Sequence, residues 1–335
     1  MVRRGAVVRM AAIGIVTAIL VTLVAVLIPW LPSSASVQMD RITFAYWFIT
    51  VVSIGIFSLV VAVIAYSMMA FRAQPDDESD GPPIHGHTGL EVMWTAIPAV
   101  IVIAIGVLSA VVLSRNAEAG SSPLTVKVYA QQFAWRFEYP DEGGIRSNEL
   151  VLAVDRSTRF EMTAADVIHS FWIPQMGQKQ DLLPGVETSI VVTPTREGRF
   201  TLVCTELCGL GHATMRAPVR VLSDTAFDQW LADQREPAPG GTDGASVFAS
   251  AGCGGCHAFT PAGSKGAIGP SLDDLAAAAQ EAGQPLEAFV RESIVDPAAY
   301  VPPGFKPGSM PETFGQSLSA DELDALVAYL TQTKE

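Results

Sequence analysis

Residues 204–215 read Cys204-Thr-Glu-Leu-Cys208-Gly-Leu-Gly-His212-Ala-Thr-Met215. Two thiols, an imidazole and a thioether therefore lie within one short stretch, and sulfur and imidazole are donors that suit copper. The β-branched and aromatic run directly before it, residues 199–203, predicts a strand. We therefore expect the cluster on a loop at the end of a strand, where it would bind copper. A disulfide and a zinc site are the alternatives.

The residues around this stretch predict a strand-rich domain. Between about Leu124 and Leu222, runs such as 124–129 and 189–193 alternate in polarity or are β-branched. Turn signals, such as the pair Gly143-Gly144, separate these runs. Short strands at this spacing predict a β-sandwich or a small barrel. A second imidazole, His169, belongs to the same domain.

Three apolar segments precede this domain, at about residues 7–31, 42–71 and 92–113. Each is near or above the roughly 20 residues that cross a bilayer as a helix. Arginines before the first segment and after the second place the N-terminus and the loop 73–90 in the cytoplasm, so the chain after residue 115 lies outside. With Ser33-Ser34-Ala35 behind it, the first segment reads either as a cleaved signal peptide or as a third span.

The composition supports a membrane protein and argues against a nucleic-acid partner. Only 16% of the 335 residues are charged, the net charge is −13, and the mean hydropathy is +0.33. Ordinary soluble proteins have about 25% charged residues, and binding to phosphates needs clustered Lys and Arg. Residues 237–335 carry a net charge of −8, which favours a partner with a basic surface.

A second pair of cysteines lies beyond a predicted linker at residues 235–244, in a region where 245–251 and 319–331 predict helices. Cys253-Gly-Gly-Cys256-His257 is the pattern of c-type haem attachment. Two thioether bonds would hold the haem and His257 would ligate its iron. Met310 is the only methionine of this region and the candidate sixth ligand. The alternatives are a redox-active dithiol and a methionine that fills a core.

Taken together, these motifs resemble subunit II of the haem–copper cytochrome c oxidases, and the added haem motif resembles the caa-type enzymes, whose subunit II carries a fused cytochrome c. The resemblance implies a cupredoxin domain with a binuclear copper centre, CuA, in which both thiolates bridge two coppers. It also implies a magnesium ion at the boundary with subunit I, bound by the Glu206 side chain. The implied copper ligands are His169, Cys204, the Glu206 carbonyl, Cys208, His212 and Met215.

Two further positions are interpreted through this resemblance. Glu91 begins the stretch Glu91-Val-Met-Trp-Thr-Ala-Ile-Pro98, which resembles the family's second membrane helix. The resemblance implies that Glu91 takes up protons. The alternative is an interfacial acid at a helix N-terminus, where the helix dipole favours a negative charge. The family usually has tryptophan where Phe133 stands, so the residue that first accepts an electron stays open, with Trp135 the nearest indole. The alternating aromatics of 133–139 predict one buried strand face.

We therefore expect a multi-domain membrane protein: a signal peptide or extra helix (1–35), a transmembrane hairpin (36–118), a cupredoxin CuA domain (119–234), the linker, and an all-α class I-like cytochrome c domain (245–335). Its predicted function is that of subunit II of a proton-pumping cytochrome c oxidase in the bacterial plasma membrane. The resemblance implies subunits I and III as partners, and a cytochrome bc complex or a small cytochrome c as donor. The alternatives are a membrane-anchored electron carrier without an oxidase and a copper-delivery protein.

Overall fold

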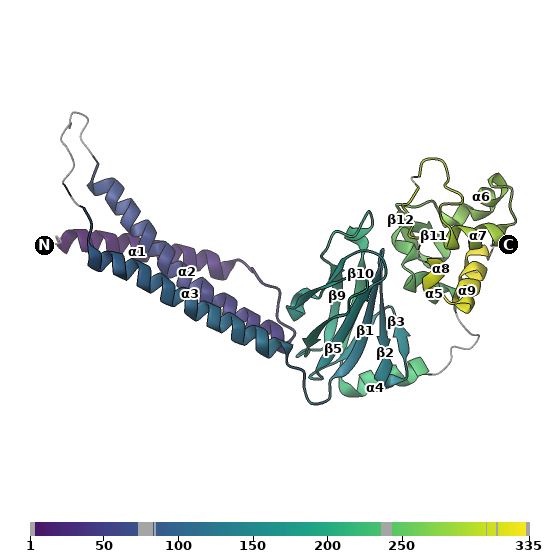
Figure 1. The fold of residues 1–335 in the computed structure, drawn as a ribbon, viewed down its shortest axis with the longest axis horizontal. Helices are drawn as coiled ribbons and strands as arrows, with labels where there is room; N and C mark the ends of the chain where they lie inside the picture. Colours follow the sequence, from purple (N-terminus) through teal and green to yellow (C-terminus); the bar gives the residue numbers. More distant parts are fainter. Residues whose placement is uncertain are drawn as a thin grey trace. The chain divides into compact units, whose positions relative to one another are not determined.

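The computed structural model describes residues 4–72, 83, 85–235, 243–305, 307–312 and 314–332. Most of the predicted cytoplasmic loop 73–90 and of the predicted linker 235–244 lies outside the described residues. The chain divides into two compact units (Figure 1). The first holds the N-terminal helices, and the second holds residues 118–335 together with the short segment Ala35–Met39.

The first unit contains the helices α1 (Arg4–Leu27), α2 (Val37–Ala70) and α3 (Thr88–Ala117). All three are long and apolar enough to cross a membrane. Apolar side chains cover every side of them and are largely exposed, which suits a lipid environment or a membrane partner. The guanidinium of Arg41 donates hydrogen bonds to the carbonyl of Arg115 and the side chain of Asn116, joining the start of α2 to the end of α3.

The second unit begins with a β-sandwich of two five-stranded sheets. The first sheet has the order β3-β2-β1-β5-β8, with bounds Ile145–Ser147, Ala134–Tyr139, Leu124–Gln131, Thr158–Ala164 and Thr188–Val192. The second has the order β4-β10-β9-β6-β7, with bounds Leu150–Ala153, Arg216–Leu222, Gly198–Cys204, His169–Trp172 and Lys179–Leu182.

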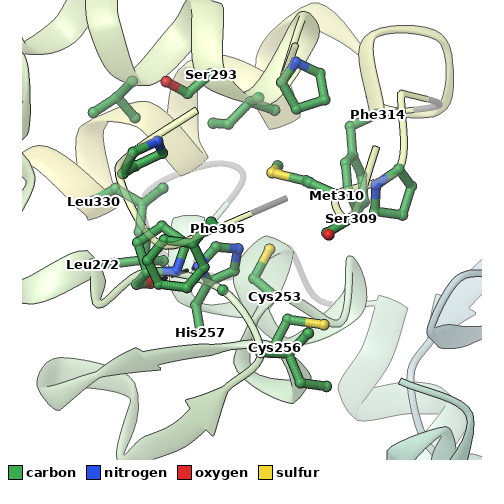
Figure 2. Close-up of a pocket in the computed structure, with 18 of the residues that line it drawn as sticks. Cys253, Cys256, His257, Leu272, Ser293, Phe305, Ser309, Met310, Phe314 and Leu330 are labelled. Atoms are coloured by element: carbon green, nitrogen blue, oxygen red, sulfur yellow. Dashed lines mark hydrogen bonds between the residues drawn. The ribbon is translucent and has the colours of Figure 1, made fainter. Parts of the chain in front are cut away.

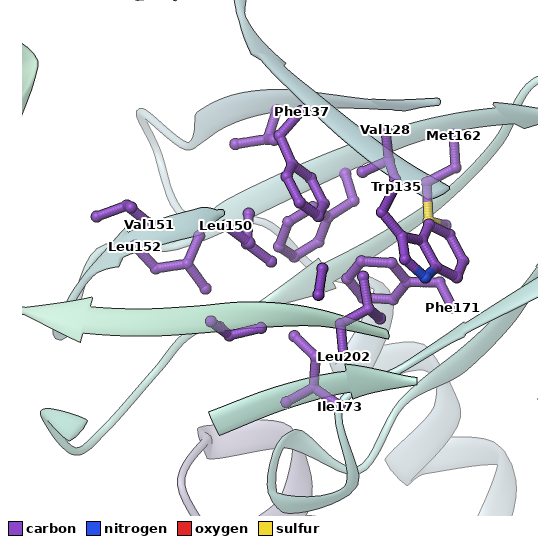
Figure 3. Packing of buried hydrophobic residues seen from close by; sticks show 14 of the residues in the cluster. Val128, Trp135, Phe137, Leu150, Val151, Leu152, Met162, Phe171, Ile173 and Leu202 are labelled. Atoms are coloured by element: carbon purple, nitrogen blue, oxygen red, sulfur yellow. The ribbon is translucent and has the colours of Figure 1, made fainter. Parts of the chain in front are cut away.

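Alternate side chains of these strands face inward and form one core (Figure 3). Phe160 and Phe171 come from different sheets, and their ring centroids lie 5.1 Å apart. The helix α4 (Asp224–Arg235) follows the last strand and packs on the core through Trp230, whose ring lies 5.1 Å from that of Tyr139. The β-sandwich prediction is confirmed. The prediction that Phe133 shares the strand face is wrong, because β2 begins at Ala134 and Phe133 lies in the turn before it.

The segment Ala35–Met39 belongs to the second unit, although it includes the first residues of α2. The main-chain N–H of Ala35 donates to the carbonyl of Gln175, and that of Thr195 donates to the carbonyl of Ala35. The hydroxyl of Ser36 donates to the carbonyl of Met176 at 2.9 Å. Both Ala35 and Ser36 are fully buried, so the start of this segment is anchored to the sandwich.

The described residues from 243 to 332 are mainly helical, in line with the predicted cytochrome c domain. Its main helices are α5 (Gly244–Ser250), α6 (Leu275–Glu281), α7 (Leu286–Val295), α8 (Phe314–Ser317) and α9 (Ala320–Thr331). A small hairpin of β11 (His257–Phe259) and β12 (Ser264–Ala267) is a departure from the predicted all-α domain.

The first and last of these helices, α5 and α9, are in intimate contact. A Cβ added at Gly244 would lie 2.2 Å from the carbonyl oxygen of Ala325 and 2.5 Å from the Cβ of Tyr329. The rings of Phe248 and Tyr329 meet beside this point, with centroids 6.0 Å apart. Only glycine allows the two backbones to come this close, so Gly244 fixes the packing of the domain's two ends.

Candidate copper and haem sites

The sandwich brings His169 next to the cysteine loop. His169 begins β6 and Cys204 ends β9, and these antiparallel strands are neighbours, with Phe171 opposite Cys204. After Cys204 the chain forms a loop that returns as β10 at residue 216. The ligand candidates are therefore placed by two core strands and one loop, at one end of the sandwich.

The two sulfur atoms lie at the centre of the cluster, and each faces one imidazole. The Sγ atoms of Cys204 and Cys208 are 3.9 Å apart, almost twice the length of a disulfide bond. Nδ1 of His169 lies 3.9 Å from the first sulfur, and Nδ1 of His212 lies 3.6 Å from the second. Sδ of Met215 is 3.7 Å from the Cys208 sulfur.

The main-chain carbonyl of Glu206 lies 3.3 Å from the Cys204 sulfur, so the structure brings together all six predicted ligand groups. The Glu206 side chain itself is exposed. Ligand atoms of His169, Cys204 and Cys208 fall within 4.8 Å of one another, and a metal–sulfur bond is about 2.3 Å long. An ion can therefore bind both sulfurs at once with an imidazole beside it, so the donor set fits copper.

Asp166 fixes the orientation of the first imidazole, and the sequence analysis did not single it out. Its Oδ1 lies 2.8 Å from Nε2 of the fully buried His169, which leaves Nδ1 directed at the sulfur. Burial favours the neutral forms of Asp166 and His169. The hydrogen bond between the two side chains outweighs this effect of burial, so the pKa of Asp166 is lowered and that of His169 is raised. A carboxylate behind a ligating histidine is a frequent arrangement in metal sites, so an acid three residues before a ligand was the available signal.

The two thiols differ in their electrostatic surroundings. Burial alone would raise the pKa of Cys204, but hydrogen bonds with His169 and with main-chain groups outweigh it and lower that pKa. Burial and the adjacent Cys204 charge raise the pKa of Cys208. Two thiolates this close need a cation between them, because like charges in a buried site repel strongly. The pocket is therefore electrostatically suited to a metal.

The cytochrome-like domain encloses a largely apolar pocket that Cys253, Cys256, His257 and Met310 all line. Figure 2 shows the imidazole of His257 and the sulfur atoms of Cys253 and Met310 directed into it. Nδ1 of His257 lies 2.8 Å from the carbonyl of Pro270, so Nε2 is the ring nitrogen that can bind a metal.

Two neighbouring features make His257 suitable as a metal ligand. Burial lowers its pKa, which keeps the ring in the neutral form that binds metals. A Cβ added at Gly269 would lie 2.5 Å from Cε1 of the ring, so the close main chain there fixes the ring plane. Apolar side chains such as Leu272 and Phe314 complete the wall. A flat hydrophobic macrocycle held by two thioethers fits this pocket.

Glu91 lies in the first turn of α3 and is exposed. Its Oε1 accepts a hydrogen bond from the main-chain N–H of His87 at 3.2 Å, and Nδ1 of His87 accepts one from the N–H of Leu90 at 3.3 Å. These bonds cap the helix. His85 and His87 are exposed.

Three stretches of the chain match known protein families. Residues 24–112 match the transmembrane domain of cytochrome c oxidase subunit II, residues 145–222 match its periplasmic domain, and residues 241–334 match cytochrome c. Cytochrome c oxidase subunit 2 of Synechocystis is 33% identical over 256 residues, which cover 62% of this chain and 76% of the relative. The chain belongs to the cytochrome c oxidase subunit II family.

A second relative matches a longer stretch of the chain. Cytochrome c oxidase subunit 2 of Alkalihalophilus pseudofirmus is 29% identical over 304 residues, covering 85% of each chain. Among solved structures, the periplasmic domain of cytochrome oxidase subunit II from Bradyrhizobium japonicum is 31% identical, with a TM-score of 0.34, and covers 36% of this chain and 98% of its own.

Family membership settles the coarse assignment. The chain is a component of a haem–copper oxidase, a membrane protein whose subunit II domain is periplasmic, and its family implies a subunit I partner. The cytochrome c domain implies haem c, and the subunit II domain implies a copper centre.

Proposed function

We propose that this subunit carries electrons from a covalently bound haem c to a binuclear CuA centre and on to haem in subunit I, where oxygen is reduced to water. The observation that carries the proposal is the pair of cysteine sulfurs 3.9 Å apart. Each sulfur has its own imidazole, which is a symmetrical donor set for two ions. The proposed copper ligands are the six groups from His169, Cys204, Glu206, Cys208, His212 and Met215.

When bound, copper and haem supply the one-electron chemistry, and the chain's residues keep the surroundings fixed. Asp166 holds His169, and core strands hold His169 and Cys204. Cys204 is 7% exposed and Cys208 is 4% exposed, so water is nearly excluded from the sulfurs. A rigid, dry donor set rearranges little when its charge changes, which favours rapid electron transfer.

The haem pocket would work in the same way. Cys253 and Cys256 would form the thioether bonds, and the Pro270 carbonyl would hold His257 in the orientation that ligates iron. Met310 would supply a second protein ligand to the iron, and ligation by methionine and histidine raises the haem potential. Joining the donor to the acceptor in one chain makes electron delivery effectively intramolecular.

The remaining roles belong to the whole enzyme. The exposed carboxylate of Glu206 is free to bind a magnesium ion at the boundary with subunit I, and Glu91 is the candidate for proton uptake in a proton-pumping enzyme. Subunit III and a cytochrome bc complex or small cytochrome c complete the proposed assembly in a bacterial plasma membrane. The proposed domain limits are those of the sequence: 1–35, 36–118, 119–234, 235–244 and 245–335.

Electron paramagnetic resonance and metal analysis of the purified oxidase test the copper assignment. We expect two subunit II coppers for each haem c, with one unpaired electron shared between them. Cys208→Ser removes one bridging sulfur and should abolish that shared signal, whereas Ser147→Ala, a change in the other sheet, should leave it intact. A single labile copper in the wild-type chain would refute the binuclear centre and favour copper delivery.

A further inference from the structure

The hairpin turn between β1 and β2 contacts both chain segments that carry the proposed copper ligands, the segment that leads into β6 and the loop after β9. It consists of Gln132 and Phe133, with Gln131 paired to Ala134 across the hairpin. Both turn residues are partly buried. A two-residue turn at a sheet end is usually solvated, so its burial calls for a reason.

Gln132 makes two hydrogen bonds, and they lead to different copper-ligand segments. Its side-chain amide donates to the main-chain carbonyl of Cys208. Its main-chain N–H donates to Oδ2 of Asp166 at 2.7 Å, and the other oxygen of that carboxylate binds His169. One residue is therefore linked to the loop after β9 and to the segment before β6.

Phe133 supports the same loop by packing. A Cβ added at Gly211 would lie 2.4 Å from Cδ2 of the ring, and one added at Gly209 would lie 3.0 Å from Cζ. The ring therefore lies against the bare main chain between Cys208 and His212. The Phe133 ring therefore packs against the outside of the cysteine loop, and the Gln132 amide is hydrogen-bonded to that loop at Cys208.

The other side of the turn belongs to the haem pocket, within the same compact unit. Gln132 and Phe133 line that pocket together with Cys253. A Cβ added at Gly252 would lie 2.7 Å from the Cβ of Ala134 and 3.6 Å from the carbonyl oxygen of Phe133. The turn thus contacts the haem-attachment loop through main chain and small side chains. The side-chain amide of Gln132 is directed at the cysteine loop instead.

We propose that Gln132 is a positioning residue of the copper centre, whose side-chain amide holds the Cys208 loop in register with the Asp166–His169 pair. The inference rests on the proposed copper function. A carbonyl next to a bridging thiolate determines how that thiolate is presented, and partners of metal ligands typically change metal affinity 10- to 100-fold when removed.

Two replacements of similar size separate the hydrogen bond from simple packing. Gln132→Met and Gln132→Glu both fill the space and keep the main-chain N–H, but neither can donate to the Cys208 carbonyl. In the intact oxidase we expect both to lose copper to a chelator at 10- to 100-fold lower chelator concentration, and to show altered copper hyperfine splitting.

The matched control is Gln178→Met. Gln178 is another partly buried glutamine of the sandwich whose amide donates to a main-chain carbonyl, that of Val191. This variant loses an equivalent bond and should keep wild-type copper retention and hyperfine splitting. Complete haem attachment in all variants, measured from the haem c absorption, shows that the cytochrome c domain has folded, and wild-type tryptophan fluorescence shows that the sandwich has folded.

The outcomes distinguish a failure of this inference from a failure of the proposed copper function. If the wild-type oxidase lacks a shared two-copper signal, the proposed function fails. If that signal is present and both Gln132 variants match the wild type, or Gln178→Met changes the signal equally, the positioning role alone is refuted.

Discussion

Replacing Gly244 by alanine should destabilise the cytochrome domain, although alanine is the better helix former. Helix propensity gives alanine at most about 1 kcal/mol over glycine, and less at the first residue of a helix. Against this, the added Cβ would lie 2.2 Å from the main-chain oxygen of Ala325 and 2.5 Å from the Cβ of Tyr329. Neither atom is the end of a flexible side chain, so α5 and α9 must separate.

Overpacking of this kind costs about 1–3 kcal/mol. For a domain of this size, each kcal/mol corresponds to a change of about 4–8 °C in Tm, so a net loss of 2 kcal/mol lowers Tm by roughly 8–16 °C. Thermal unfolding of the full chain, followed at the haem c absorption band, measures this change.

The control is Ala249→Gly, at an exposed position of the same helix. It should cost only the propensity difference of about 1 kcal/mol, so Gly244→Ala should be the less stable of the two. If Gly244→Ala unfolds at or above the wild-type temperature, α5 and α9 do not pack this closely in the folded protein.

Two further predictions concern single side chains. The buried Tyr139 hydroxyl donates to the carbonyl of Val151 at 3.0 Å and accepts from the N–H of Val151 at 2.8 Å. Tyr139→Phe should therefore lower the free energy of unfolding of the sandwich by about 1–3 kcal/mol. Urea titration followed by tryptophan fluorescence measures this change, and an unchanged midpoint would contradict the prediction. Met310→Ala should lower the haem c reduction potential in a spectroelectrochemical titration with haem attachment intact, whereas a wild-type potential would show that Met310 is not an axial ligand.

Local patterns were the part of the structure that the sequence could predict. The proposed ligands from Cys204 to Met215 lie in one short stretch. The helix predicted over 319–331 is found as α9, which begins with a capping box of Ser319 and Glu322. In both cases the interacting residues are near neighbours in the chain, so spacing alone carries the information.

Contacts between distant segments could not be predicted in this way. Gln132 and Cys208 are 76 residues apart, and no period in the sequence relates them. Phe133 continues the alternation of the aromatic strand, so a period of two assigns it to the strand face. The tight two-residue hairpin turn places it over the cysteine loop instead, and only the folded sandwich brings that loop there.

The segment Ala35–Met39 has a consequence for how the chain is processed. A signal peptidase needs an extended, accessible substrate at the small residues of its cleavage site, here Ser33 to Ala35. Ala35 and Ser36 have no exposed surface in the folded protein, and their hydrogen bonds reach Gln175 and Met176. Any cut after Ala35 must therefore come during translocation, before the sandwich has formed, and it would leave a charged amino terminus at the fully buried Ser36. Cleavage at this position would therefore compete with folding of the sandwich.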